Sequence, residues 1–165
     1  AVEDLKEAIA EQPILLTSVG QSADVEMVKT MLTKSELKFS LNNLATSADI
    51  GDAKTLILAV GGSSKGLGAA GIDADQELDR VKELIDAADK ADMKIIALHI
   101  GGEARRGELS DKFIAPSFEK ADYAVVVADG DKDGMMVGLA SKSGMPMKVV
   151  KSMAEVIAPL KAAFK

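Results

Sequence analysis

The chain has 165 residues, of which 47% are hydrophobic, and a formal net charge of −6 at pH 7. This length and apolar content predict one folded domain, residues 1–165, with a core large enough to be stable. The acidic balance and an aromatic content of only 3% argue against nucleic acid as a partner, because such proteins carry basic faces and aromatic stacking platforms.

Cysteine is absent from the chain, and its apolar runs are short. Disulfides, zinc–thiolate sites and thiol nucleophiles are therefore excluded. No apolar run approaches the ~20 residues that span a bilayer, so we expect no membrane insertion.

The first third of the chain mixes helical and strand patterns. Val2–Ala10 has apolar residues at helical spacing and is predicted to be a helix, ended by Pro13. A short buried strand is predicted at Ile14–Thr17. Ser22 is expected to cap the following helix, and Phe39–Leu44 is expected to form a second strand.

The middle of the chain holds the clearest strand, Thr55–Val60, and a glycine-rich stretch, Gly61–Asp73 (GGSSKGLGAAGID). We expect this stretch to be a long loop without structure of its own, which in a compact domain is usually functional or mobile. Its glycines would let the backbone come close to a ligand. A long helix capped by Asp73 or Asp75 should follow.

The second half continues the alternation of strand and helix. The expected elements are the strand Lys94–His99, a helix over Glu108–Lys120 interrupted or restarted at Pro116, the strand Tyr123–Val127, the helix Met135–Lys142, the strand Met147–Val150 and the helix Met153–Phe164.

Several of these strands are continuous apolar runs, which is typical of a parallel sheet covered on both faces. We therefore predict an α/β fold: a three-layer sandwich around a mostly parallel five- or six-stranded sheet. The default strand order at this length is flavodoxin-like or Rossmann-like, 2-1-3-4-5, with right-handed crossovers.

In such sheets, ligands bind beyond the carboxyl ends of the strands, near the point where the strand order reverses. The loops expected there are more polar and richer in glycine than those at the opposite end. We therefore expect a small-molecule site formed by the loops after the first, third and fourth strands. Its candidate residues are Gly20, Gln21, Ser22, Gly61, Gly62, Ser63, Ser64, Lys65, Gly66, His99, Arg105 and Arg106.

Three of these candidates, Lys65, Arg105 and Arg106, are cations that could meet a negative charge on the ligand. The alternative for the two arginines is a solvated loop in which they pair with Glu103 or Glu108.

Two motifs match known binding loops only in part. The glycines from Gly66 to Gly71 spell G-x-G-x-x-G, but they start five residues after the strand, and the helix is expected only after Asp73. The dinucleotide fingerprint needs a direct strand–turn–helix context. A P-loop would need Lys where Leu67 stands, so we expect no cofactor.

Asp129, Asp131 and Asp133 resemble the start of a calcium loop, but its twelfth position is Ala140 instead of Glu. We expect no metal site. If one exists, these three aspartates would form it; otherwise they solvate the loop and cap the next helix.

His99 is the single histidine and could serve as a general base. A hydrogen-bonded structural role is the alternative, because no catalytic partner is identifiable. Ser63 and Ser64 lack the context of a nucleophile elbow, so catalysis is not the leading expectation.

Three segments carry a family resemblance: PILLTSVGQSADVEMVK (Pro13–Lys29), TLILAVGGSSKGLGAAGIDADQELDRV (Thr55–Val81) and KIIALHIGGEARRGELSDKFI (Lys94–Ile114). They resemble a bacterial domain family of unknown function, over nearly the whole chain. Its members are small and often carry an export signal. The resemblance implies a location outside the cytoplasm, with Ala1 as a mature N-terminus, and assigns no activity to any residue.

Three functions remain open at this point. The leading one is non-enzymatic binding of a small, possibly anionic molecule whose identity the sequence does not reveal. The second is a hydrolase or transferase that uses His99 as its base. The third is a structural protein that assembles as a homo-oligomer.

Overall fold

The computed structural model describes residues 2–165 as an α/β fold around one sheet. Six strands pair in parallel throughout, in the order β2-β1-β3-β4-β5-β6. The predicted fold class is confirmed, and a sixth strand extends the flavodoxin-like order. The strands are β1 (Ile14–Val19), β2 (Phe39–Leu41), β3 (Thr55–Val60), β4 (Lys94–His99), β5 (Tyr123–Val127) and β6 (Met147–Val150).

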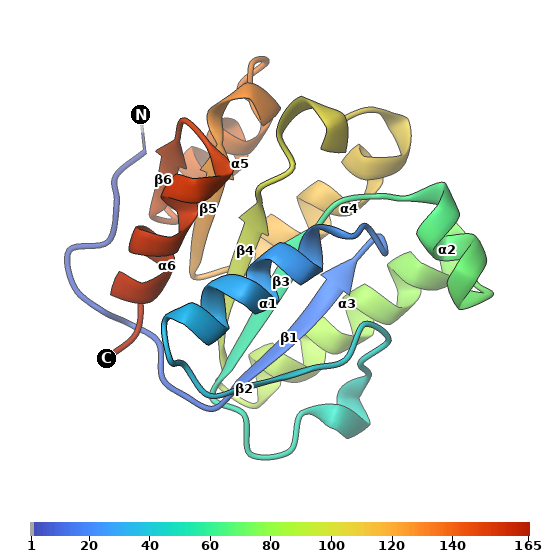
Figure 1. Cartoon of the computed structure of the whole chain (residues 1–165), viewed down its shortest axis with the longest axis horizontal. Coiled ribbons are helices and arrows are strands. Elements are labelled where there is room, and N and C mark those ends of the chain that lie inside the picture. Colours follow the sequence, from blue (N-terminus) through green and yellow to red (C-terminus); the bar gives the residue numbers. More distant parts are fainter. Residues whose placement is uncertain (1) are drawn as a thin grey trace.

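Helices cover both faces of the sheet. Their bounds are α1 (Asp24–Lys34), α2 (Ser64–Ala70), α3 (Ala74–Lys90), α4 (Glu108–Glu119), α5 (Met135–Ser143) and α6 (Ile157–Ala162). Figure 1 shows α1 and α6 in front of the sheet and α3 and α4 behind it. Pro116 lies inside α4, which runs through it without a break. No helix in the described part of the chain is long and apolar enough to cross a bilayer.

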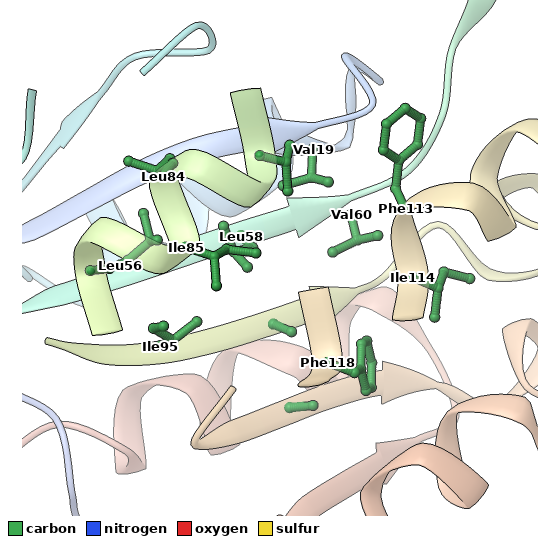
Figure 2. Close-up of a cluster of buried hydrophobic side chains, with 14 of the residues drawn as sticks. Val19, Leu56, Leu58, Val60, Leu84, Ile85, Ile95, Phe113, Ile114 and Phe118 are labelled. Atoms are coloured by element: carbon green, nitrogen blue, oxygen red, sulfur yellow. The ribbon is translucent and has the colours of Figure 1, made fainter. Parts of the chain in front are cut away.

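The core explains why the strands are apolar on both faces. Leu56 and Leu58 of β3 pack toward α3 and α4, where they join Phe113 and Phe118 (Figure 2). Ile57, between them in the sequence, faces the other side with the residues of α1 and α6. Successive strand residues point to opposite faces, so a sheet with two covered faces buries all six residues of β3.

The N-terminal segment corrects one prediction, because Val2–Ala10 is not a helix. It is an extended strap along the side of the molecule (Figure 1). The Glu3 carbonyl accepts a hydrogen bond from the Met147 amide at 2.9 Å, and Tyr123 donates its hydroxyl to Asp4 at 2.7 Å.

The strap passes the amino ends of β6, β5 and β3, ending where Thr55 donates to the Glu11 carbonyl. Its apolar residues Leu5 and Ile9 pack on the core. A helix of nine residues is marginal by itself, and here the backbone of the strap hydrogen-bonds to Met147 at the start of β6 and to Ala163 and Lys165 at the C-terminus.

The glycine-rich stretch corrects a second prediction. Residues 61–73 are not structureless, because they contain α2. Ser63 caps this helix by accepting the Gly66 amide at 3.0 Å, Leu67 anchors it in the core, and Gly71 ends it with φ of 73°. A serine cap, one buried leucine and a left-handed glycine suffice for two turns.

Three element boundaries also differ from expectation. The second strand stops at Leu41, where Asn42 begins a turn. The last helix is split into a 3₁₀ turn, Met153–Val156, and α6. Ser22 does not cap α1, which has Ala23 at its N-cap, although the Ser22 Oγ accepts the Asp24 amide at 3.3 Å.

Candidate functional site

The carboxyl ends of β1 and β3 lie level with each other, since Val19 pairs with Val60. The loops that follow are joined by backbone hydrogen bonds: the Ser63 amide donates to Gly20 at 2.9 Å, and the Ser22 amide donates to Gly61 at 3.2 Å. The crevice at the reversal of strand order is therefore closed by the two loops themselves.

The glycines of these two loops let one backbone segment approach another. The sequence had predicted that they would let the backbone approach a ligand. Gly20 has φ of 98°, and a Cβ on it would lie 2.5 Å from the Gly61 carbonyl oxygen. A Cβ on Gly66 would collide with the backbone carbonyl of Gln21, so α2 packs directly on the loop after β1. Gly62 donates its amide to Ser110 at the start of α4.

A buried ion pair, which the sequence patterns did not predict, lies beneath the loop that follows β1. The Glu77 side chain is 0% exposed and binds the Arg80 Nε at 2.8 Å. Its Oε2 also accepts the Gly20 amide and the Gln21 side-chain amide, both at 2.9 Å. Arg80 in turn donates to the carbonyl of Ser18 at 2.6 Å. This satisfied network holds the loop after β1 in place.

A signal for this pair exists in the sequence. Glu77 occupies a position of the apolar stripe of α3 that continues through Val81, Leu84 and Ala88, and all four residues are buried. A carboxylate on a core-facing stripe is costly unless it is paired, and Arg80 stands one turn away.

Arg105 lies across the carboxyl edge of the sheet. Its Nε donates to the Asp24 Oδ2 at 3.1 Å, which links the segment after β4 to the first turn of α1. A Cβ on Gly61 would come within 3.1 Å of the Arg105 Cδ, and a Cβ on Gly101 would collide with both Arg105 and Asp24. The Arg105 side chain therefore lies between Gly61 and Gly101.

The exposure of this pair matters for ligand access. The Arg105 side chain is 26% exposed and that of Asp24 is 11% exposed. Within residues 2–165 the guanidinium makes a hydrogen bond through Nε alone, whereas its two Nη groups make none. A guanidinium carries five N–H donors, so most of them remain available.

His99 lies below Arg105, at the end of β4, and is 0% exposed. Its Nε2 is 2.6 Å from the Arg105 carbonyl oxygen. A carbonyl can only accept, so Nε2 carries the proton and Nδ1 is a bare acceptor; Nδ1 is buried without a partner among the described residues. Burial is the main cause that lowers the pKa of His99, and the nearby Arg106 lowers it further.

Arg106 has a different environment from its neighbour in the sequence. It binds Asp111 and Asp133, each at 2.8 Å, and donates to the Gly130 carbonyl. Hydrogen bonds to Asp133 and Asp111 raise the pKa of Arg106. This residue joins two loops and has little capacity left for a ligand. The alternative partners expected from the sequence, Glu103 and Glu108, are not the ones that it uses.

Two of the three aspartates of the calcium-like loop, Asp131 and Asp133, are bound to separate partners. Asp131 accepts the amides of Met136 and Val137 at 2.7 and 3.0 Å, so it caps α5. Asp133 pairs with Arg106, which lowers the pKa of that carboxyl to about 2. The described residues contain no group of three or more acidic or histidine side chains placed to hold a metal.

Ser64 and Lys65 are exposed in the first turn of α2. Surface hollows lie elsewhere. A groove of about 610 Å³ separates the N-terminal strap from the connection between α5 and β6, and another of about 410 Å³ lies between α3 and α4. Neither is lined by a residue predicted for the site.

Comparison with known families identifies the chain. The model of a family described as a domain of unknown function, DUF6305, matches residues 11–164. The chain belongs to the DUF6305 family. The resemblance to an uncharacterised family is thereby confirmed, and membership assigns no activity.

No curated protein matches this DUF6305 chain. Among solved structures, it is similar to the psychrotrophic esterase EstA from Pseudoalteromonas sp., inhibited by monoethylphosphonate. The two share 12% identity with a TM-score of 0.36, over 83% of this chain and 76% of the esterase. A likeness this low carries no argument about activity.

Proposed function

We propose that the protein binds a small anionic molecule at the carboxyl edge of its sheet, through Arg105, and that it does so without catalysis. The supporting observation is the position of Arg105. Its guanidinium lies over the ends of β3 and β4, is partly exposed, and makes a hydrogen bond within the described residues through Nε alone. Guanidinium groups bind carboxylates and phosphates through paired N–H donors.

The remaining candidates divide by role. Lys65 and Ser64, exposed on α2, supply charge and hydrogen-bonding groups on the same edge. Gly61 and Gly101 leave room for the arginine. Gln21 and Arg106 hold the loops, since their polar groups bind Glu77, Asp111 and Asp133.

Non-catalytic binding fits the side chains present better than catalysis does. A general base must reach the proton that it removes, and His99 is 0% exposed. Ser63 already accepts the helix-capping amide of Gly66, and Ser22 is 2% exposed. Ser64 and Lys65, the exposed residues in the first turn of α2, are neutral and cationic, which suits recognition of an anion.

The test uses sulfate and a panel of small carboxylates and phosphates as probes. We expect at least one to stabilise the wild-type protein against heat and to shift the Arg105 Nε–H signal in NMR spectra. In Arg105→Ala the apparent affinity for that probe should fall about ten-fold, because one charged hydrogen-bonding group is lost. Lys151→Ala, at an exposed position after β6, should bind as the wild type does. Equal binding by Arg105→Ala would refute the proposed contact.

A further inference from the structure

We propose that His99 is a positioning residue of the carboxyl-edge site, fixing Arg105 in its ligand-binding place through the hydrogen bond from its Nε2 to the Arg105 carbonyl oxygen. This inference rests on the proposed function, because it concerns the same arginine. It differs from the catalytic role considered for His99, since the imidazole touches no ligand and acts only through Arg105.

The geometry gives the imidazole little freedom. His99 is the last residue of β4, and its neighbour in the register, Val126 of β5, is buried. On the ring's other side, a Cβ added to Gly130 would lie 3.0 Å from both Nδ1 and Cε1. The ring is therefore clamped between a central strand and the backbone after β5. A donor held this firmly fixes the acceptor, the Arg105 carbonyl, at 2.6 Å.

The direction of this hydrogen bond determines the state of the ring. With the proton on Nε2, the neutral imidazole leaves Nδ1 as an acceptor facing Gly130. A second proton would have to enter on Nδ1, at a buried place with no acceptor bound to it. A proton on this unpartnered Nδ1 would be a buried charge without an acceptor, which is costly, so the packing favours the neutral ring.

Charged groups from several elements surround the ring. Asp24 of α1 favours protonation and Arg106 opposes it, while burial opposes it most. The hydrogen bond to the Arg105 carbonyl also favours protonation. Asp129, after β5, packs against Gly102 in the same layer of loops.

The experiment compares His99→Gln with His99→Asn. A glutamine amide reaches the position of the imidazole Nε2, whereas an asparagine amide is too short and reaches only that of Nδ1. Both variants keep a polar, uncharged side chain. Sulfate is the probe, because its charge does not change between pH 8 and 5.5. Titrations followed by NMR give the dissociation constant and the Arg105 Nε–H signal for each protein.

We expect His99→Gln to bind sulfate within about two-fold of the wild type and His99→Asn to bind about ten-fold more weakly, the effect of one lost hydrogen bond. The wild-type ring should show a protonated Nε2 and a bare Nδ1 at pH 7. Equal affinity in the two variants, or a proton on Nδ1, would overturn the inference.

Failure of the proposed function gives a separate pattern. If no anion binds the wild type, the Arg105 Nε–H signal still tests the positioning role. That signal should be protected from exchange by Asp24 in the wild type and in His99→Gln, and exposed in His99→Asn. If His99→Asn does not fold, the tautomer of the wild-type ring and the affinity of His99→Gln decide the inference.

Discussion

Arg105 and Arg106 are adjacent in the sequence and have different partners. Arg106 binds two carboxylates and a carbonyl, whereas Arg105 makes a hydrogen bond to Asp24 through its Nε. The sequence placed both in one candidate site, because charge and loop position are the same for the two. The direction of each side chain decides that Arg106 is paired on every nitrogen, whereas Arg105 is paired through Nε alone among the described residues.

Under the proposed function, Asp24 would compete with the anionic ligand for Arg105. We predict that Asp24→Asn raises the affinity for sulfate a few-fold, because a neutral amide holds the guanidinium less tightly than a carboxylate does. Titration by NMR measures the change. Asp79→Asn, at an exposed position on α3, is the matched control and should have no effect. A weaker affinity in Asp24→Asn would show that Asp24 orients Arg105 and does not compete for it.

His99 should make the stability of the protein depend on pH. Burial lowers its pKa in the folded state, while the unfolded chain keeps a value near ~6.5. Below pH ~6.5 the unfolded state therefore binds a proton that the folded state does not, so acid favours unfolding. The stabilisation is present above this pH and is lost as the pH falls.

We expect the free energy of unfolding, from urea titrations between pH 7.5 and 5.5, to decrease by at most about 1.4 kcal/mol per pH unit. His99→Gln should remove this slope. His99 is the only histidine, so other side chains contribute little in this window. An unchanged slope in the variant would assign the effect to another group.

At the scale of elements, Gly66 allows α2 to pack closely on the loop after β1. Gly66 and Gly68 both lie in this helix. A Cβ on Gly66 would collide with the Gln21 carbonyl, whereas a Cβ on Gly68 meets nothing within 4 Å. The two positions therefore form a matched pair for substitution.

We predict that Gly66→Ala lowers the free energy of unfolding by about 1–3 kcal/mol, the usual effect of overpacking. Gly68→Ala should raise it by about 0.5–1 kcal/mol, because alanine loses less conformational entropy in a helix. Urea unfolding of the two variants measures both changes. Equal effects would mean that α2 shifts away from the first loop without cost.

The buried pair of α3 stabilises the loop after β1. We predict that Glu77→Gln lowers the free energy of unfolding by about 3 kcal/mol, because it leaves the Arg80 guanidinium buried without its counter-charge. The amides of Gly20 and Gln21, which bind Glu77, should also exchange faster with solvent. Asp79→Asn again serves as the control on the same helix. A near-wild-type stability would show that Arg80 finds compensation in its carbonyl partners.

At the scale of the whole molecule, the strap and the candidate site lie at opposite ends of the sheet. The strap binds near the amino ends of the strands, and Arg105 lies over their carboxyl ends. Changes at distant sites with no shared partners are usually additive. Loosening the strap should therefore leave the candidate site intact.

Tyr123→Phe tests this separation, because it removes only the hydroxyl that binds Asp4. We expect stability to fall by about 1 kcal/mol and the amides of the strap to exchange faster with solvent, while the affinity for sulfate stays constant. A change in affinity would mean that the sheet couples its two ends.

The parallel sheet could be predicted from the sequence because it depends on local patterns. Continuous apolar runs such as Thr55–Val60 indicate a sheet buried on both faces, and that expectation is confirmed. Val2–Ala10 could not be predicted in the same way. Helical spacing of its apolar residues fits a strap equally well, and its backbone partners come from β6 and the C-terminus, far away in the chain.

The sequence by itself determined the fold class, the family and the set of polar loops at the carboxyl edge, because each depends on residues that are neighbours in the chain. The tertiary structure decided which polar groups are free there. Glu77, Arg106 and Asp131 are bound by partners on other elements, and His99 is buried beneath Arg105. Whether a charged side chain is available to a ligand depends on contacts between distant segments, and no local pattern records them.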